Sequence, residues 1–98
     1  MFEWDESKRI KNIAEHGIDF IDAAFIFQDE TALLETVDDR TDYGEIRIRA
    51  LGQVDNDWFI VVYTWRRQKR RIISAWKVNE NGKRRYKNIF YGRAEKDA

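Results

Sequence analysis

The 98-residue sequence contains no cysteine, no proline and a single histidine. Without cysteine the chain forms neither disulfides nor thiolate metal sites, and one histidine argues against a histidine-built metal site. We therefore expect no metal and no other cofactor. The lack of disulfides also fits a reducing compartment, and we expect the protein to act in the cytoplasm.

Long hydrophobic runs are missing as well. The longest apolar stretches, residues 23–27 and 58–65, are far shorter than the roughly 20 residues that a membrane-spanning helix needs. The opening residues MFEWDE carry acidic charge and lack the apolar core of a signal peptide. We accordingly expect no contact with a membrane.

The composition is that of a folded protein with a highly charged surface. Hydrophobic residues make up 43% of the chain and aromatic residues 14%, which is too rich for a disordered segment. The length is that of one domain, and we expect a single domain over residues 1–98.

The formal net charge of zero hides a strong separation of charge. Residues 1–64 hold 15 acidic and 6 basic residues, a net charge of −9, whereas residues 65–98 hold 3 acidic and 12 basic residues, a net charge of +9. The two halves could pair with each other, or the basic half could face an anionic partner. Nucleic acid is one such partner, and an acidic protein is another.

Helical spacing and capping residues predict two short helices near the N-terminus. The first covers residues 5–17, with Asp5 as its N-cap and Gly17 as its C-terminal cap, and it carries Ile10 and Ile13 on one face. The second covers residues 19–27 and begins at Asp19.

An alternating pattern then predicts strands, and the last segment predicts a helix. The predicted strands cover residues 31–37, 45–51, 58–65 and 71–78, and residues 2–4 could add a short one. The last two form an antiparallel hairpin. Apolar spacing from Tyr86 onward favours a terminal helix over a hairpin turn at Asn81–Gly82.

The predicted fold class is therefore α+β: two N-terminal helices, an antiparallel sheet of about four strands and a C-terminal helix, with the helices against one face of the sheet. In the last strand, strict alternation predicts that Arg71 and Lys77 share a face, about 20 Å apart at ~3.3 Å per residue.

The segment Arg66–Lys77 is the most distinctive chemical feature, with five cations in its first six residues. Arg66 and Arg71 flank the predicted hairpin loop and could meet across it, while Lys77 is expected near Tyr86 at the start of the last helix. Such a path suits the spaced phosphates of single-stranded RNA. The residues expected to bind RNA are Arg67, Lys69, Arg70, Trp76, Lys83 and Arg84.

Plainer interpretations stay open beside this one. A charge run at a hairpin tip often does no more than keep a sheet edge soluble. The tryptophans and Tyr86 could pack in the core rather than stack on bases. His16, at the end of a predicted helix, could simply suit the helix dipole.

Several pieces in order resemble the BrnT toxins of type II toxin–antitoxin systems, over residues 2–87. The pieces are W-D-x-x-K at Trp4–Lys8, N-x-x-x-H-G at Asn12–Gly17, G-E-x-R at Gly44–Arg47 and R-I-I-S-A at Arg71–Ala75. The resemblance implies a RelE-like ribonuclease fold and metal-independent cleavage of RNA that stops translation.

The resemblance also implies partners and site residues. The partner is a BrnA-like antitoxin of the ribbon-helix-helix type, with two toxins and two antitoxins in the complex and operator DNA bound only through the antitoxin. The matching positions are His16, Arg66, Arg71, Ser74, Lys77 and Tyr86. Arg66 and Arg71 would clamp phosphate, and Lys77 and Tyr86, with His16 in reserve, would transfer protons.

Two departures from the family pattern leave the activity open. The family usually has Arg where this chain has Trp76, and a Glu opening the last helix where it has Gly82. We therefore carry three interpretations: an RNA-cleaving toxin, a toxin-like module that holds an antitoxin or RNA without cutting, and a plain nucleic-acid-binding or structural domain.

Overall fold

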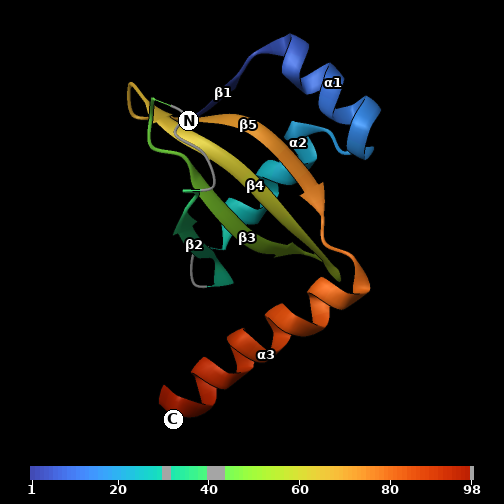
Figure 1. The fold of residues 1–98 in the computed structure, drawn as a ribbon, viewed down its shortest axis with the longest axis vertical. Coiled ribbons are helices and arrows are strands. Elements are labelled where there is room, and N and C mark those ends of the chain that lie inside the picture. Colours follow the sequence, from blue (N-terminus) through green and yellow to red (C-terminus); the bar gives the residue numbers. More distant parts are fainter. Residues whose placement is uncertain (30–31, 40–43, 98) are drawn as a thin grey trace.

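The computed structural model describes residues 1–29, 32–39 and 44–97, with side chains as far as residue 88. Its elements, in chain order, are β1 (Phe2–Trp4), α1 (Glu6–His16), α2 (Phe20–Ala23), the 3₁₀ helix η1 (Ala24–Gln28), β2 (Leu34–Val37), β3 (Ile48–Val54), β4 (Asp57–Arg66), β5 (Lys69–Lys77) and α3 (Glu80–Asp97). Figure 1 shows α2 and η1 crossing one face of a twisted sheet, and α3 running away from its end. The predicted α+β class is confirmed.

The sheet has five strands in the order β1-β5-β4-β3-β2. β1 runs parallel to β5, pairing Phe2 with Arg70 and Trp4 with Ile72, and the other three pairs are antiparallel. The predicted hairpin is confirmed, but the prediction of about four antiparallel strands is wrong. A three-residue strand has too little pattern to reveal its direction, which pairing with a distant segment decides. Thr31, predicted to begin β2, lies outside the described residues.

Three predicted caps hold the N-terminal helices. Asp5 accepts a hydrogen bond from the Ser7 N–H at 2.9 Å, and the Gly17 N–H, with φ of 69°, donates to Ile13 O at 2.8 Å. Asp19 accepts from the Ile21 N–H at 3.0 Å at the start of α2. The hydrogen bonds from Ser7 hold the pKa of the Asp5 carboxyl below its usual value.

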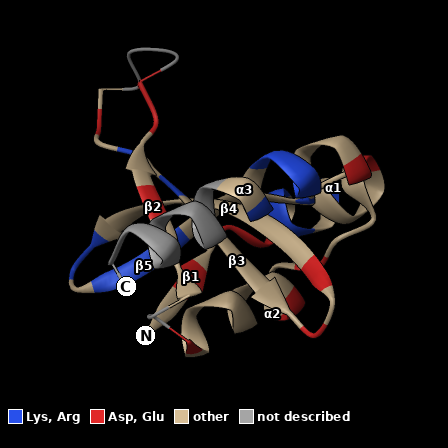
Figure 2. Ribbon diagram, turned by 90° about the horizontal axis from the view of Figure 1, so that it is seen from below, with Lys and Arg blue, Asp and Glu red and all other residues tan. Residues whose placement is uncertain are grey.

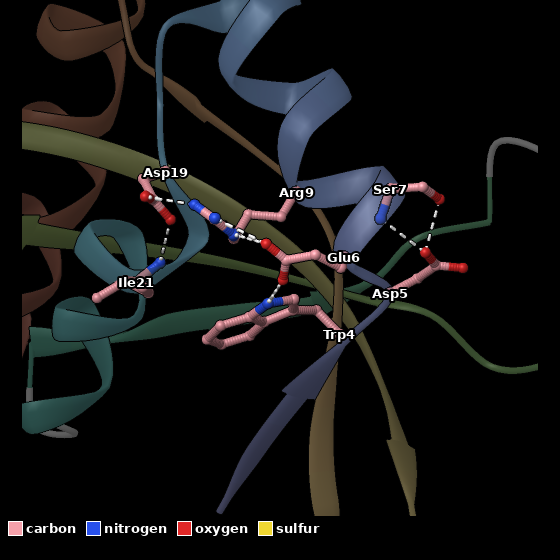
Figure 3. A network of polar contacts seen from close by, with 7 residues as sticks. All are labelled: Trp4, Asp5, Glu6, Ser7, Arg9, Asp19 and Ile21. Carbon is pink, nitrogen blue, oxygen red and sulfur yellow. Dashed lines mark hydrogen bonds and ion pairs between the residues drawn. The ribbon is translucent and has the colours of Figure 1, made fainter.

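A polar network around Arg9 joins β1, α1 and α2 (Figure 3). Arg9 bonds Glu6 at 2.7 Å and Asp19 at 2.8 Å, and the Trp4 indole donates to Glu6 at 3.2 Å. The hydrogen bond from Arg9 lowers the pKa of Glu6 and raises that of Arg9 itself. The two capped helices are thus connected through their polar ends.

The larger core lies between the sheet and the α2–η1 segment. Its fully buried members include Phe20 and Ile26 from the helices, and Val61, Tyr63 and Ile72 from the strands. We call this side of the sheet the helix face. At Gly52 an added Cβ would lie 2.6 Å from Ile26 Cβ, so η1 can approach β3 only because this residue has no side chain. The helix predicted over residues 19–27 divides here into α2 and η1.

α3 lies at the opposite face, so the prediction that the helices share one face is wrong for this helix. Tyr86 packs there against a smaller core of Leu51, Trp58, Ile60 and Val78. The helix itself, preferred to a turn at residues 81–82, is confirmed. Asn79 Oδ1 accepts a hydrogen bond from the Gly82 N–H at 2.8 Å and so caps its first turn.

A β-bulge in β5 decides which residues share a face. Val62 pairs with Ser74 and Tyr63 pairs with Ile72, which leaves Ile73 without a partner on β4. After the bulge the alternation shifts by one residue. Arg71 consequently points away from the helix face, whereas Lys77 lies on the helix-face side of β5. The prediction that the two residues share a face is wrong.

Asn12 attaches α1 to the sheet. Its carboxamide accepts a hydrogen bond from Ala75 N–H at 3.1 Å and donates to Ala75 O at 2.8 Å and to Ile18 O at 2.9 Å. Asn12 is the one residue of α1 that is buried, whereas Ile10 and Ile13 are 59% and 38% exposed. A polar side chain, and not the apolar face of the helix, holds α1 in place.

We predict that Asn12→Ala lowers the free energy of unfolding by about 2–4 kcal/mol, because it removes three hydrogen bonds and leaves Ala75 backbone groups unpaired in the interior. Urea denaturation followed by circular dichroism measures the change. Lys11→Ala, one residue away and exposed, is the control and should shift stability by less than about 0.5 kcal/mol. Equal stabilities of the two variants would contradict the role given to Asn12.

Candidate functional site

The sheet face opposite α2 and η1 carries a row of cations and an aromatic side chain. Strand pairing aligns Arg66 with Lys69, Thr64 with Arg71, and Arg49 with Val62, all on this side. We call this surface the basic face and define it by Arg49, Arg66, Lys69, Arg71 and Trp76. Figure 2 shows Lys and Arg gathered at the hairpin end of β4 and β5.

At the hairpin end, Arg66 and Arg71, which the sequence predicts could meet across the loop, are diagonal neighbours on paired strands. Arg66 lies opposite Lys69, and Arg71 is two residues further along the same strand. Diagonal neighbours of this kind are about 7–8 Å apart, so two long guanidinium side chains can reach one phosphate group. Arg67 lies in the tight turn beside them, with φ of 52°.

Glu3 fixes the direction of Arg71. β1 aligns Glu3 with Arg71, and their charged groups are 3.7 Å apart. Both side chains are about 30% exposed, so the ion pair orients the guanidinium more than it stabilises the fold. The short parallel strand thereby contributes to the site.

At the other end of the basic face, residues from β3, β4, β5 and α3 line a hollow of about 190 Å³. They include Arg49 of β3, Ile60 of β4, Trp76 and Lys77 of β5, and Tyr86 of α3. The Arg49 guanidinium lies 5.7 Å from the centre of the Trp76 ring, within the range of a cation–π contact. A phenol, an indole and a guanidinium therefore meet at one surface depression, and Lys77 also borders it.

Lys77 borders this hollow at the far end of β5, although strand alternation directs its side chain toward the helix-face side. Its ammonium group forms an ion pair with Asp57 at 3.2 Å, and the side chain is half exposed. Lys83 and Arg84 follow on the first turns of α3, where Lys83 is partly buried and Arg84 is exposed. Because Lys77 and Tyr86 line the same hollow, they lie near each other, as the sequence predicts.

His16 ends α1 at the side of this group. Its ring centre lies 6.2 Å from that of Trp76, and the side chain is exposed. The same imidazole lines a second hollow with Ser74, between α1 and β5. His16 is thus beside the basic face and not at its centre.

Arg70 is in a different environment from the other predicted RNA-binding residues. It lies on the helix face, 13% exposed, with its guanidinium 4.4 Å from the Phe27 ring centre and 4.7 Å from that of Trp65. Glu35 lies 4.0 Å away and also accepts a hydrogen bond from the Tyr63 hydroxyl at 2.6 Å. We therefore leave Arg70 out of the proposed site and regard it as part of the packing.

Sequence reasoning missed Arg49. The alternation of Ile46, Arg47, Ile48 and Arg49 indicated that these arginines share a face, but a charge beside a core face is usually solvated. Only the strand order, with β3 next to β4, brings Arg49 over Trp76 and beside Tyr86.

Neither metal ligands nor a membrane span is found in the described parts of the chain. Within residues 1–29, 32–39 and 44–97, no group of three His, Asp or Glu side chains is arranged to hold a metal ion. None of the helices in these segments is long and apolar enough to cross a membrane.

Comparison with known protein families identifies a match. The family model for BrnT, the ribonuclease toxin of type II toxin–antitoxin systems, matches residues 4–81. The matched region runs from β1 to the start of α3 and includes all five residues of the basic face, whereas Tyr86 follows it. No curated protein sequence matches the chain.

The environment of Tyr63 beside Arg70 predicts a pH effect. Burial, helped by the hydrogen bond to Glu35, raises the pKa of Tyr63 to about 12. Since the unfolded phenol ionises near pH 10, the stabilisation is complete below that pH and is lost as the pH rises through about 12. We expect the wild type to lose up to about 2 kcal/mol more than Tyr63→Phe over this interval, measured by urea unfolding. Parallel losses would contradict the assignment.

Proposed function

The chain belongs to the BrnT family, the ribonuclease toxins of type II toxin–antitoxin systems, and from this premise we propose that it cuts RNA on the basic face. One observation carries this proposal: strand register aligns Arg66, Arg71 and Arg49 on the face of the sheet where Tyr86 packs. One domain, residues 1–98, would carry this activity, and its inhibition of translation would take place in the cytoplasm.

The hairpin end would hold RNA by its phosphates. Each guanidinium, of Arg66 or of Arg71, can bind two oxygens of a phosphate, and the two residues are close enough to bind the same phosphate group. Arg67 and Lys69 add positive charge beside them. These contacts do not depend on base identity. They would position the strand so that its bases run toward Trp76, whose half-buried ring offers a surface for stacking.

The hollow at the α3 end would hold the phosphate that is cut. The ribose 2′ oxygen attacks phosphorus, loses its proton to a base, and forms a cyclic phosphate as the bond to the 5′ oxygen breaks. Tyr86 would give its proton to that leaving oxygen, and Arg49 would stabilise the negative charge that collects on the phosphate oxygens. His16, as a neutral imidazole, is the candidate for accepting the 2′ proton, and the ammonium of Lys77 would add positive charge at this end of the sheet.

Two local arrangements offset the departures from the family pattern. Trp76 replaces the usual Arg, yet the Arg49 guanidinium lies over its ring, so a guanidinium is available at that place. Gly82 replaces the usual Glu, yet α3 begins at Glu80, and a Cβ at position 82 would lie only 2.7 Å from Val78 Cγ1. The Arg49 guanidinium beside Trp76 favours a toxin that cuts over one that only binds, and the close approach of Val78 explains why position 82 has no side chain.

A type II toxin acts together with an antitoxin protein. The resemblance supports a BrnA-like ribbon-helix-helix partner, two toxins and two antitoxins in the complex, and operator DNA bound only through the antitoxin. An antitoxin that covers the basic face would compete directly with RNA. Mass measurement of the co-expressed complex, with and without operator DNA, tests these expectations.

We predict that the purified toxin cuts labelled single-stranded RNA in EDTA, and that Arg66→Ala/Arg71→Ala lowers kcat/KM at least about 100-fold, since phosphate clamping is lost. The matched control is Arg85→Ala/Lys87→Ala, which removes two exposed cations from α3 and should change kcat/KM less than about threefold. A folded Arg66/Arg71 variant with full activity would refute the assignment.

We predict that Tyr86→Phe lowers kcat about 100-fold but leaves RNA affinity nearly unchanged, because only the hydroxyl is removed and the ring still packs on Trp58 and Ile60. Arg49→Ala should lower kcat at least as much, whereas Arg49→Lys should recover part of the loss. Single-turnover cleavage and anisotropy binding separate the two effects. If Tyr86→Phe weakens binding and leaves kcat unchanged, the hydroxyl does not take part in proton transfer.

A further inference from the structure

A second hollow lies outside the basic face, between α1 and the bulged part of β5. Its volume is about 210 Å³. It is lined on one side by Lys8, Lys11, Asn12, Glu15 and His16 of α1, and on the other by Ile73 and Ser74. Lys8 and Lys11 share one side of α1 because they are three residues apart, which is close to one turn. None of the chemistry proposed above uses the two lysines.

Most polar groups that line this hollow are hydrogen-bond donors: the ammonium groups of Lys8 and Lys11, the imidazole of His16 and the hydroxyl of Ser74. In the described part of the chain, the Lys8 ammonium has no ion-pair partner and the Ser74 hydroxyl has no hydrogen-bond partner. Lys11 faces Glu15 at 3.8 Å, with side chains 73% and 54% exposed, and such a pair contributes little and opens readily. An anion in the hollow could therefore accept hydrogen bonds from Lys8 and Ser74, and breaking the Lys11–Glu15 ion pair would cost little free energy.

The position of the hollow is fixed by two features of the fold. The hydrogen bonds of Asn12 hold α1 against Ala75, which sets the distance between the lysines and the strand. The bulge at Ile73 turns Ser74 onto the basic-face side of β5. Helix and strand are thus held together before any ligand binds, which reduces the entropic cost of binding.

The hollow continues directly from the basic face. Ser74 shares a row across the sheet with Val62 and Arg49. His16 lies at the rim, with its ring 6.2 Å from that of Trp76. An RNA strand that stacks on Trp76 would reach the lysines with its neighbouring nucleotide.

We propose that this hollow, between Lys8 and Lys11 of α1 and Ser74 of β5, is a second phosphate-binding site for the RNA strand, one nucleotide or more beyond the place of cleavage. It rests on the proposed function of the basic face. Continuity with the basic face favours RNA over an acidic peptide, because a strand that stacks on Trp76 would reach the lysines with its next phosphate, and the Glu15 carboxylate could accept a hydrogen bond from a ribose 2′-hydroxyl. Lys8 and Lys11 would neutralise the phosphate, and Ser74 would donate to it.

The test measures RNA binding as a function of salt in Lys8→Ala/Lys11→Ala. The reference protein and the double variant both carry Tyr86→Phe, which slows cutting. Each protein is titrated into a labelled 12-nucleotide single-stranded RNA at several salt concentrations between about 50 and 200 mM. For single strands the slope of log K against log salt falls by about 0.7 for each phosphate contact. We expect the double variant to bind about tenfold more weakly, with a slope smaller by about 0.7–1.4, while Arg85→Ala/Lys87→Ala changes neither.

Cleavage by the protein with Tyr86 intact provides the second readout. The Lys8/Lys11 variant should cut the 12-nucleotide RNA about tenfold less efficiently, but a dinucleotide, too short to reach the hollow, with unchanged kcat/KM. Equal slopes and equal cleavage of the long RNA would overturn the second site and leave the basic face intact. Loss of antitoxin binding with unchanged RNA binding would assign the lysines to the antitoxin and also overturn it. A wild type that neither binds nor cuts any RNA would instead overturn the proposed function.

Discussion

The carboxamide of Asn12 is the contact on which the arrangement of the site depends. β1 has only three residues and pairs with β5 no further than Ile72, so beyond this point no strand among the described residues lies beside this edge of β5. Asn12 supplies the missing donor and acceptor at Ala75 and a further bond to Ile18. An amide group imitates the backbone of a strand, which explains how a helix with an exposed apolar face stays attached to the sheet.

Strand alternation and the bulge at Ile73 together distribute the cations of β5 between the two faces of the sheet. Arg70 and Arg71 are adjacent in sequence and chemically identical, yet Arg70 is enclosed by Phe27, Tyr63 and Trp65 while Arg71 faces the basic side. Beyond the bulge the alternation of side chains shifts by one residue. Ser74 and Trp76 therefore lie on the same face as Arg71, and Lys77 lies on the other face. Alternation along β5 thus separates Arg70, which packs in the core, from Arg71, which is available to phosphate, and the inserted residue keeps Lys77 off the face of Arg71.

Local signals in the sequence identified the elements, whereas long-range pairing determined the site. Asp5, Gly17 and Asp19 act within two or four residues of themselves, and their roles as caps were predictable. The parallel pairing of β1, the bulge and the position of α3 depend on contacts between distant segments, which no local period encodes. Arg49 was missed for this reason, since its partner Trp76 is 27 positions away and on a strand that is not its neighbour.

The separation of charge along the chain becomes a separation in space only through this topology. Acidic residues of the first half form ion pairs with cations of the second half: Glu3 with Arg71, Glu35 with Arg70, and Asp57 with Lys77. Each of these carboxylates neutralises a cation of the second half without covering the hairpin end. Arg66, Arg67 and Lys69 form no ion pair with the described residues, and they concentrate positive charge where a polyanion would first make contact. A chain with no net charge can thus attract RNA, because its acidic residues compensate the cations that position the site and leave those at the entrance free.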